Sequence, residues 1–168
     1  MKLNIRLADK RKDYDEIWEI FKRVISTGDT YVFDPYTPKE KLTQYWLAEY
    51  METFVAVDEN DAILGTYIIK PNQIDLGNHI ANSSYMVNPK FQGRGIGKLL
   101  CEYSINYAKE KGFLGMQFNV VVSTNIAAIR LWEKFGFKII GKTPNGFRHN
   151  TFGFVDTLIM FKDLKFDG

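Results

Sequence analysis

The stretch that decides the fold is Val87-Asn88-Pro89-Lys90-Phe91-Gln92-Gly93-Arg94-Gly95-Ile96-Gly97-Lys98, which joins an apolar, strand-like segment to a long amphipathic segment. Main-chain N–H groups at a helix start have no partner and lie at the positive end of the helix dipole. Glycines there let an anionic ligand approach the main chain closely. The stretch therefore predicts a site for a cofactor with a diphosphate. Spacing alone leaves open the alternative of a glycine-rich turn that only connects strand and helix.

Two common nucleotide-binding loops do not match this stretch. The dinucleotide fingerprint is G-x-G-x-x-G, whereas the glycines here are residues 93, 95 and 97. A P-loop requires Ser or Thr after its Gly-Lys, and Leu99 follows Lys98. A nucleotide-dependent enzyme is therefore disfavoured.

The hydrophobic periodicity predicts an α/β domain with a partly parallel sheet. Helical spacing favours helices from residue 13 to the glycine at 28, from about 37 to 51, from 96 to about 111, and over 125–135. Apolar or alternating runs predict strands at 3–7, 54–57, 63–69, 80–87, 116–122, 137–140 and 154–161.

Length and composition indicate one domain over residues 1–168, large enough to bury roughly 70% of its unfolded surface. The single Cys101 cannot form an internal disulfide, and no N-terminal apolar segment resembles a signal peptide, so we expect a cytoplasmic location. No segment is predicted to span a membrane. A net charge of +2 with scattered basic residues disfavours a nucleic-acid partner, so the partner should be a small molecule.

Two motifs resemble those of the GCN5-related N-acetyltransferase (GNAT) superfamily. Residues 92–97 match the pattern Q/R-x-x-G-x-G/A, and residues 125–137 are similar to a second signature, an Asn-started helix that ends in an aromatic-Gly-Phe turn. The resemblance implies a mixed sheet of about seven strands flanked by about four helices. It also implies acetyl-coenzyme A as co-substrate, with no metal.

The resemblance further implies which residues hold the cofactor. The main chain of the glycine loop would bind the diphosphate, with added charge from two cations, and the main chain of the preceding strand would pair with the pantetheine arm. Asn125 would cap its helix and also reach the arm; capping alone is the alternative. The expected cofactor residues are Met86, Val87, Gln92, Gly93, Arg94, Gly95, Ile96, Gly97, Lys98, Asn125 and Trp132.

Trp132 departs from the family pattern, because many relatives carry at this place a Tyr that protonates the departing thiolate. An indole N–H is not a useful acid. A thiol with a pKa near ~8.5 leaves moderately well as thiolate, so a hydrogen-bond donor could suffice. The same departure keeps open a coenzyme A-binding module without catalysis.

The candidate catalytic residues are Asn82 and Asn119. The strand at 80–87 carries no carboxylate, which favours deprotonation through water. Asn119 with Asn125, the helix segment 129–132 and the tail segments 147–149 and 153–156 resemble fungal acetyltransferases of proline analogues such as azetidine-2-carboxylate. In that branch asparagines at matching places orient the substrate. The alternative is a pair of core amides that bond to neighbouring backbone.

We therefore expect direct acetyl transfer, in a ternary complex, to the amine of a small molecule such as an amino acid. Transfer to protein or peptide amines is the alternative acceptor class. The loop at 27–36 either lines the acceptor pocket, as the resemblance implies, or fills the core edge with aromatics. His149, next to Arg148 in a loop between the last two strands, contacts an acceptor carboxylate or stabilises a loop or a subunit contact. Aromatic residues near these C-terminal strands that we expect to be exposed are compatible with a homodimer.

Overall fold

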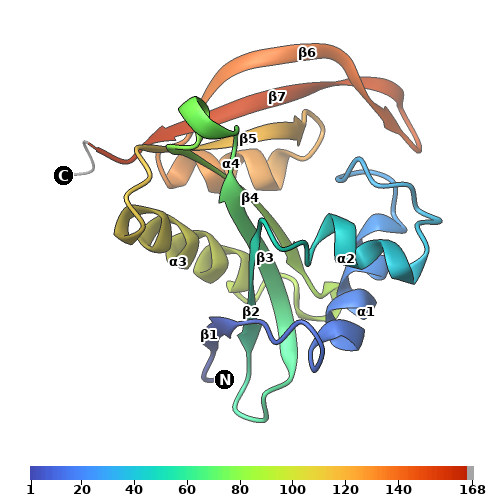
Figure 1. Cartoon of the computed structure of the whole chain (residues 1–168). Helices are drawn as coiled ribbons and strands as arrows, with labels where there is room; N and C mark the ends of the chain where they lie inside the picture. The colour runs from blue at the N-terminus through green and yellow to red at the C-terminus, as the bar shows by residue number, and fades with distance from the viewer. Residues whose placement is uncertain (166–168) are drawn as a thin grey trace.

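The computed structural model describes residues 1–165, and in them a seven-stranded mixed sheet has the order β1-β2-β3-β4-β5-β7-β6 (Figure 1). This confirms the predicted fold class. The strands are β1 (Asn4–Leu7), β2 (Glu52–Val57), β3 (Ile63–Pro71), β4 (Ile80–Val87), β5 (Gly115–Val122), β6 (Lys138–His149) and β7 (Gly153–Asp163). The helices are α1 (Tyr14–Ile25), α2 (Leu42–Tyr45), α3 (Ile96–Glu110) and α4 (Ile126–Lys134), with short 3₁₀ turns at Lys39–Lys41, Asp75–Gly77 and Pro89–Phe91.

Apolar side chains from the helices form two cores, one on each face of the sheet. On one face, Phe21 of α1 and Trp46 after α2 belong to a buried cluster with Val55 and Ile68 of the strands. On the other face, side chains of α3 and α4 pack in a second cluster with those of β4, β5 and the edge strands. Burial of apolar area on both faces is the main stabilising contribution to this three-layer arrangement.

The sheet opens between its two central strands. β4 and β5 run parallel and pair only at Ile80 with Gly115, Ala81 with Met116 and Asn82 with Gln117. The edge of β4 that faces β5 therefore has no strand partner from residue 83 onward. Because unpaired main-chain groups need a partner, this edge is ready to receive another extended chain.

Hydrogen bonds at both ends of β4 show which of its residues face that open edge. Asn72 N–H donates to the Ile80 carbonyl at 2.7 Å, and Asn88 N–H donates to the Leu64 carbonyl at 2.8 Å. Main-chain groups of an antiparallel strand alternate between its two edges, so even-numbered residues of β4 bond to β3. The main-chain groups of residues 83, 85 and 87 consequently point toward the opening.

The second helix is much shorter than the sequence predicts. The expectation of a helix from 37 to 51 is wrong, because α2 ends at Tyr45. The N–H groups of Trp46 and Leu47 both bond to the Leu42 carbonyl, and the Trp46 carbonyl accepts a bond from Thr53 Oγ1 at 2.6 Å. The Trp46 indole N–H also donates to a threonine hydroxyl of β3 at 3.1 Å. These bonds to the sheet, absent from local sequence, end the helix.

The last two strands are longer than predicted and form a long hairpin. Residues 138–149 pair with 153–163, with a register shift between Thr143 and Phe147. The assignment of Arg148 and His149 to a loop is therefore wrong, since both belong to β6. His149 nevertheless shapes the adjacent turn, because its Nδ1 accepts bonds from the N–H groups of residues 151 and 152 at 3.0 and 3.2 Å. The loop-stabilising interpretation of His149 is confirmed.

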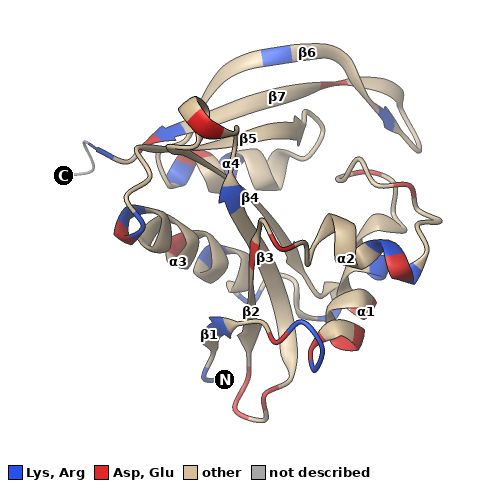
Figure 2. Ribbon diagram, viewed as in Figure 1, with Lys and Arg blue, Asp and Glu red and all other residues tan. Residues whose placement is uncertain are grey.

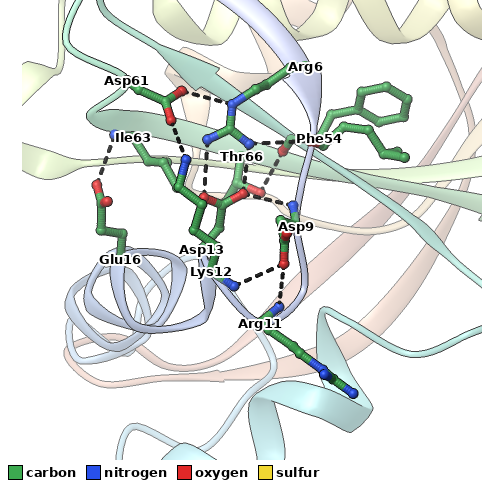
Figure 3. A network of polar contacts seen from close by, with 11 residues as sticks. Arg6, Asp9, Arg11, Lys12, Asp13, Glu16, Phe54, Asp61, Ile63 and Thr66 are labelled. Atoms are coloured by element: carbon green, nitrogen blue, oxygen red, sulfur yellow. Dashed lines mark hydrogen bonds and ion pairs between the residues drawn. The ribbon is translucent and has the colours of Figure 1, made fainter.

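A polar network ties the N-terminal strand to α1 and to the β2–β3 turn (Figure 3). Arg6 bonds through Nη1 to the buried Asp13 at 2.7 Å and through Nε to Asp61 at 2.9 Å. Lys12 also reaches Asp61 at 2.9 Å. The two cations hold the pKa of Asp61 at about 2, the hydrogen bond from Arg6 being the larger cause. The network therefore fixes the outer edge of the sheet.

Basic residues are interspersed with acidic ones in the view of Figure 2. This agrees with the small net charge of +2. Among residues 1–165, no helix is both long enough and apolar enough to cross a membrane.

Candidate functional site

The start of α3 presents free main-chain donors. Its N-cap is Gly95, with φ +79°, and no side chain caps the helix. The first helical N–H with a main-chain partner is that of Leu99, which donates to the Gly95 carbonyl at 3.0 Å. The N–H groups of residues 96–98 therefore have no acceptor within the helix, and a 15-residue dipole lies behind them. Gly93, with φ +76°, completes a turn that only glycine adopts without strain.

Gly97 differs from these glycines because its backbone does not require glycine. Its φ is not positive, and an added Cβ would lie 3.7 Å from Val87 Cγ2 and 3.8 Å from Leu131 Cδ2, which is ordinary van der Waals contact. Alanine is also the better helix former. Neither conformation nor packing explains the missing Cβ, so the space beside Gly97 is available for a ligand.

A cavity of about 740 Å³ extends from this helix start along the open edge of β4. It lies between β4 and α3 on one side and β5 and α4 on the other. The described residues that line it include three cations, Lys98, Arg130 and Lys134, and no Asp, Glu or His. A cleft with free N–H groups, several cations and no carboxylate suits a polyanionic ligand.

The sequence-predicted cofactor residues mostly meet in this cleft. Gln92, Gly93, Gly95, Ile96, Gly97, Lys98, Met86, Val87, Asn125 and Trp132 line it. Arg94 does not line the cleft, and its guanidinium lies over the Phe91 ring, 5.2 Å from the centroid. Met86 lines the cleft, but the alternation along β4 directs its main-chain groups toward β3. The groups that face the cleft belong to Tyr85 and Val87.

The helix opposite the glycine loop begins as expected. Asn125 is the N-cap of α4, and its Oδ1 accepts the Ala128 N–H at 3.4 Å, which confirms its capping role. Trp132, further along α4, is 9% exposed, and its ring lies 4.9 Å from that of Tyr85 and 5.0 Å from that of Phe118. Trp132 thus forms an apolar wall of the cleft, packed against the Tyr85 ring of β4 and the Phe118 ring of β5.

The two candidate asparagines lie on the same face of the sheet. Asn82 pairs with Gln117 across the parallel strands, so their side chains point the same way, as does that of Asn119 two residues on. Asn82 is buried and its Nδ2 donates to the Gln117 carbonyl at 3.0 Å, next to the point where β4 and β5 separate.

Asn119 is exposed and held in a chain of side-chain amides. Its Oδ1 accepts from Gln117 Nε2 at 3.0 Å, and its Nδ2 donates to Asn72 Oδ1 at 2.8 Å. These bonds orient the Asn119 amide while leaving one of its N–H hydrogens free. Neither asparagine lines the cavity described above, so both would act from the acceptor side of the strands.

The loop at 27–36 confirms one interpretation of its sequence, the filling of the core edge, and it also borders the cleft. Phe33 fills the core edge, with ring centroids 5.0 Å from Phe21 and 4.9 Å from Tyr45. Thr30 and Tyr31 instead line the cleft. The tip of the β6–β7 hairpin closes over this loop, where Asn150 bonds to the main chain of residues 27 and 28 (Figure 1).

The potential nucleophile Cys101 lies away from the cleft. It is fully buried in α3, and burial raises the pKa of its thiol to about 12. The expectation that it is a packing residue is therefore supported. In the part of the chain that the structure describes, no group of three His, Cys, Asp or Glu residues could hold a metal ion.

The cleft residues that the sequence patterns do not predict include Tyr31, Tyr85, Arg130 and Lys134. The two cations are four residues apart on α4, a spacing that places them on one helix face. Because Asn125 caps the same helix, this spacing could have predicted that both cations face the cofactor site. Nothing local distinguishes Tyr31 from the other aromatics of its loop.

Comparisons with known proteins agree with this geometry. Residues 14–137 match the acetyltransferase (GNAT) family model. N-acetyltransferase aca1 of Schizosaccharomyces pombe is 37% identical over 86 residues, which are 51% of this chain and 41% of that protein. Peptidyl-lysine N-acetyltransferase YjaB of Salmonella typhimurium is 25% identical over 144 residues, which are 85% of this chain and 88% of that protein.

Solved structures give the same result. A GCN5-related N-acetyltransferase from Kribbella flavida has a TM-score of 0.90 and 36% identity, covering 96% of this chain and 97% of that one. YncA from Salmonella typhimurium, solved with its cofactor acetyl-CoA, has a TM-score of 0.83 and 25% identity, covering 98% of this chain and 95% of that one. The chain belongs to the GNAT family.

Proposed function

We propose that the protein is an N-acetyltransferase that moves the acetyl group of acetyl-coenzyme A to the amine of a small molecule. One observation carries the proposal: the free N–H groups at the α3 start, with Gly97 lacking a Cβ beside them, open onto a cation-lined cleft that continues along the unpaired edge of β4. The diphosphate binds to the free N–H groups at the start of α3, and the pantetheine arm adds to the β4 edge through the main chain of Tyr85 and Val87.

The phosphates are neutralised by the cations of the cleft. Lys98 follows the free N–H groups, and Arg130 with Lys134 approaches from the opposite wall. None of the three has an ion-pair partner among the described residues, so each is available to a phosphate. Asn125 supports the arm from the start of α4, and Trp132 packs beside the acyl end.

Transfer is direct, without a covalent enzyme intermediate. Among the described residues that line the cleft there is no cysteine, and no carboxylate or imidazole base lies among them to activate a hydroxyl group as a nucleophile. Because this described part of the lining holds no carboxylate or imidazole, the acceptor amine loses its proton to water. Holding the amine and the thioester together in a ternary complex then supplies the main part of the rate enhancement.

The proposed acceptor is an amino acid or an analogue. The support is the pair Asn82 and Asn119, which share one face of the sheet at the place where β4 and β5 separate. Asn119 offers a fixed amide N–H that can orient a carboxylate or a carbonyl. Peptide amines are the second candidate, because YjaB, similar over most of this chain, is a peptidyl-lysine N-acetyltransferase.

The test is acetyl-coenzyme A-dependent thiol release on free amino acids, proline analogues, polyamines and lysine peptides. Asn119→Ala is measured beside the parent, with Asn60→Ala, an exposed asparagine in the β2–β3 turn, as matched control. Turnover on an amino acid that is lost only in Asn119→Ala is the expected result. Turnover on peptides alone would overturn the small-molecule acceptor, and binding of acetyl-coenzyme A without any turnover would favour a binding module.

A further inference from the structure

Ser84 lies on β4 where the cleft meets the face of the sheet that carries the two candidate asparagines. It is half-buried and lines the cleft, whereas Asn82 and Asn119 do not. Successive side chains of a strand point to opposite faces of the sheet, so Ser84 shares the face of Asn82, two residues before it. Ser84 therefore belongs both to the cleft and to the proposed acceptor side.

The packing around β4 shows that this face is the one covered by α1. Met86, two residues after Ser84, belongs to the buried cluster that contains the α1 side chains. Val24 of α1 and Thr30 of the following loop line the same cleft as Ser84. The cleft thus reaches the α1 face of the sheet. Met86 is apolar, so Ser84 supplies the polar group that the cleft-lining part of β4 presents on this face.

The hydroxyl group of Ser84 differs from that of its neighbour Ser83. Ser83 is 3% exposed, and its hydroxyl donates to the Ile68 carbonyl at 2.5 Å. In the part of the chain that the structure describes, the Ser84 hydroxyl has no hydrogen-bond partner. A hydroxyl has one hydrogen to donate and two lone pairs that accept. The Ser83 hydroxyl therefore stabilises the sheet, and that of Ser84 is available to a bound molecule.

The reacting thioester would lie close to Ser84. If the diphosphate binds at the α3 start and the arm follows the open edge of β4 back from Val87, the arm ends where Asn82 pairs with Gln117 and closes that edge. Resting on the proposed function, we propose that Ser84 is a further catalytic residue. Its Oγ accepts a hydrogen bond from the N–H of the attacking amine and aims the nitrogen lone pair at the thioester carbon.

The reaction step balances without any change in the protonation of Ser84. The amine nitrogen forms a bond to the carbonyl carbon, and the C=O π pair moves onto the carbonyl oxygen. The double bond then re-forms as the C–S bond breaks, and sulfur leaves with the bonding pair. The proton that nitrogen loses passes through water to sulfur. Ser84 keeps its own proton throughout and forms no covalent bond.

The hydrogen bond to Ser84 strengthens during this step. Nitrogen gains positive charge as it attacks, and a hydrogen bond from a charged donor is roughly twice as strong as a neutral one. An interaction that is stronger in the transition state than in the ground state accelerates the reaction. A neutral primary or secondary amine has at least one N–H to donate, so the role of Ser84 does not depend on the acceptor class.

The test compares Ser84→Ala with Ser83→Ala, using the amine of the panel above that the parent acetylates fastest. In Ser84→Ala, kcat/KM for the amine should fall roughly 10- to 150-fold, the effect of losing a hydrogen bond to a charged group. The melting temperature and the dissociation constant of acetyl-coenzyme A should be kept, because no bond within the protein is lost. Ser83→Ala should do the opposite: it keeps the rate and lowers the melting temperature by roughly 3–10 °C, because the Ile68 carbonyl loses its buried donor.

The possible outcomes separate this inference from the proposed function. A Ser84→Ala protein that acetylates the amine as fast as the parent overturns the inference and leaves the proposed function intact. A loss of acetyl-coenzyme A binding or of melting temperature together with the rate indicates a structural role and also overturns it. The midpoint of the pH profile of kcat/KM should be the same in both proteins, since Ser84 does not ionise, and a shifted midpoint would contradict this role. No turnover by the parent on any amine of the panel would overturn the proposed function itself.

Discussion

The substitution Gly97→Ala should keep or raise the stability of the folded protein and weaken its binding of acetyl-coenzyme A. The new Cβ would meet only Val87 Cγ2 at 3.7 Å and Leu131 Cδ2 at 3.8 Å, so the folded protein accommodates it without strain. Alanine is favoured over glycine in a helix by up to about 1 kcal/mol. For a chain of this size, that corresponds to an unchanged or raised melting temperature, by up to roughly 4 °C.

Binding should change in the other direction. The methyl group would stand between β4 and α4, next to the free N–H groups of residues 96–98, where the diphosphate has to approach. Loss of one hydrogen bond to a charged phosphate costs about 1.5–3 kcal/mol, so the dissociation constant for acetyl-coenzyme A should rise roughly 10- to 150-fold.

Calorimetric titration with acetyl-coenzyme A and thermal unfolding of the free protein measure both quantities. Gly112→Ala is the control, since Gly112 has φ +84° at the opposite end of α3 and nothing within 4 Å of an added Cβ. That variant should lose roughly 1 kcal/mol of stability through backbone strain and bind normally. A Gly97→Ala protein that binds acetyl-coenzyme A as tightly as the parent would refute the diphosphate cradle.

Three further predictions concern charge and packing. Replacing both Arg130 and Lys134 by alanine should weaken acetyl-coenzyme A binding roughly tenfold and flatten its salt dependence, since exposed cations contribute up to ~1 kcal/mol each; unchanged titrations would place the phosphates elsewhere. Gly65→Ala should lower the melting temperature by roughly 3–10 °C, because the added Cβ would lie 2.9 Å from an isoleucine side chain of α3, and overpacking of this kind costs about 1–3 kcal/mol; an unchanged melting curve would contradict it. Asp61→Asn should destabilise the protein near pH 6 in denaturant titrations, and this difference in stability should fade as the pH falls from about 4 toward 2. The folded-state pKa of Asp61, about 2, lies below its ordinary value of 3.8. The contribution of Asp61 to stability is therefore complete above the unfolded-state pKa and is lost as the carboxylate protonates. A difference that persists at the lowest pH would exclude the ion-pair explanation.

The local sequence pattern was sufficient to predict the elements that form the cleft. β4 has the predicted bounds of 80–87, and Asn125 caps α4 as its chemistry suggests. These elements carry strong signals because one face of each is buried and because glycine and asparagine have specific backbone roles at their ends. The positive φ angles of Gly93 and Gly95 are the physical basis of the motif that identified the loop.

Elements whose bounds depend on distant contacts could not be predicted in this way. α2 ends where Trp46 bonds to two strands of the sheet. β6 passes through a Pro-Asn-Gly segment that looks like a loop, and it continues only because the structure places Asn145 at φ +53° and bonds its N–H to Asp156 of β7 at 3.0 Å. Neither bond can be read from residues that are adjacent in sequence.

The two sides of the proposed site differ in the same way in how far the sequence predicts them. The cofactor side is made of main-chain groups on two regular elements, so its position follows from their periodicity. The proposed acceptor side is assembled from Asn119, the loop that carries Tyr31, and the tip of a hairpin tied to that loop by Asn150, and the loop lies more than 80 residues before the other two segments. Sequence could name Asn119 through resemblance, but only the fold places Tyr31 in the cleft.

The composition of the cleft constrains how the proposed reaction proceeds. Among the described lining residues, no side chain has an ordinary pKa near neutrality, and burial raises the pKa of Tyr31 further from it. General acid–base catalysis by a lining side chain is therefore not the source of the rate. What the cleft offers instead is fixed: helix N–H groups for the proposed diphosphate and an unpaired strand edge for the proposed arm. Rate enhancement in such a site must come from positioning and from preorganised hydrogen bonds. This accounts for the tolerance of Trp132 at a position where a proton donor would otherwise be needed.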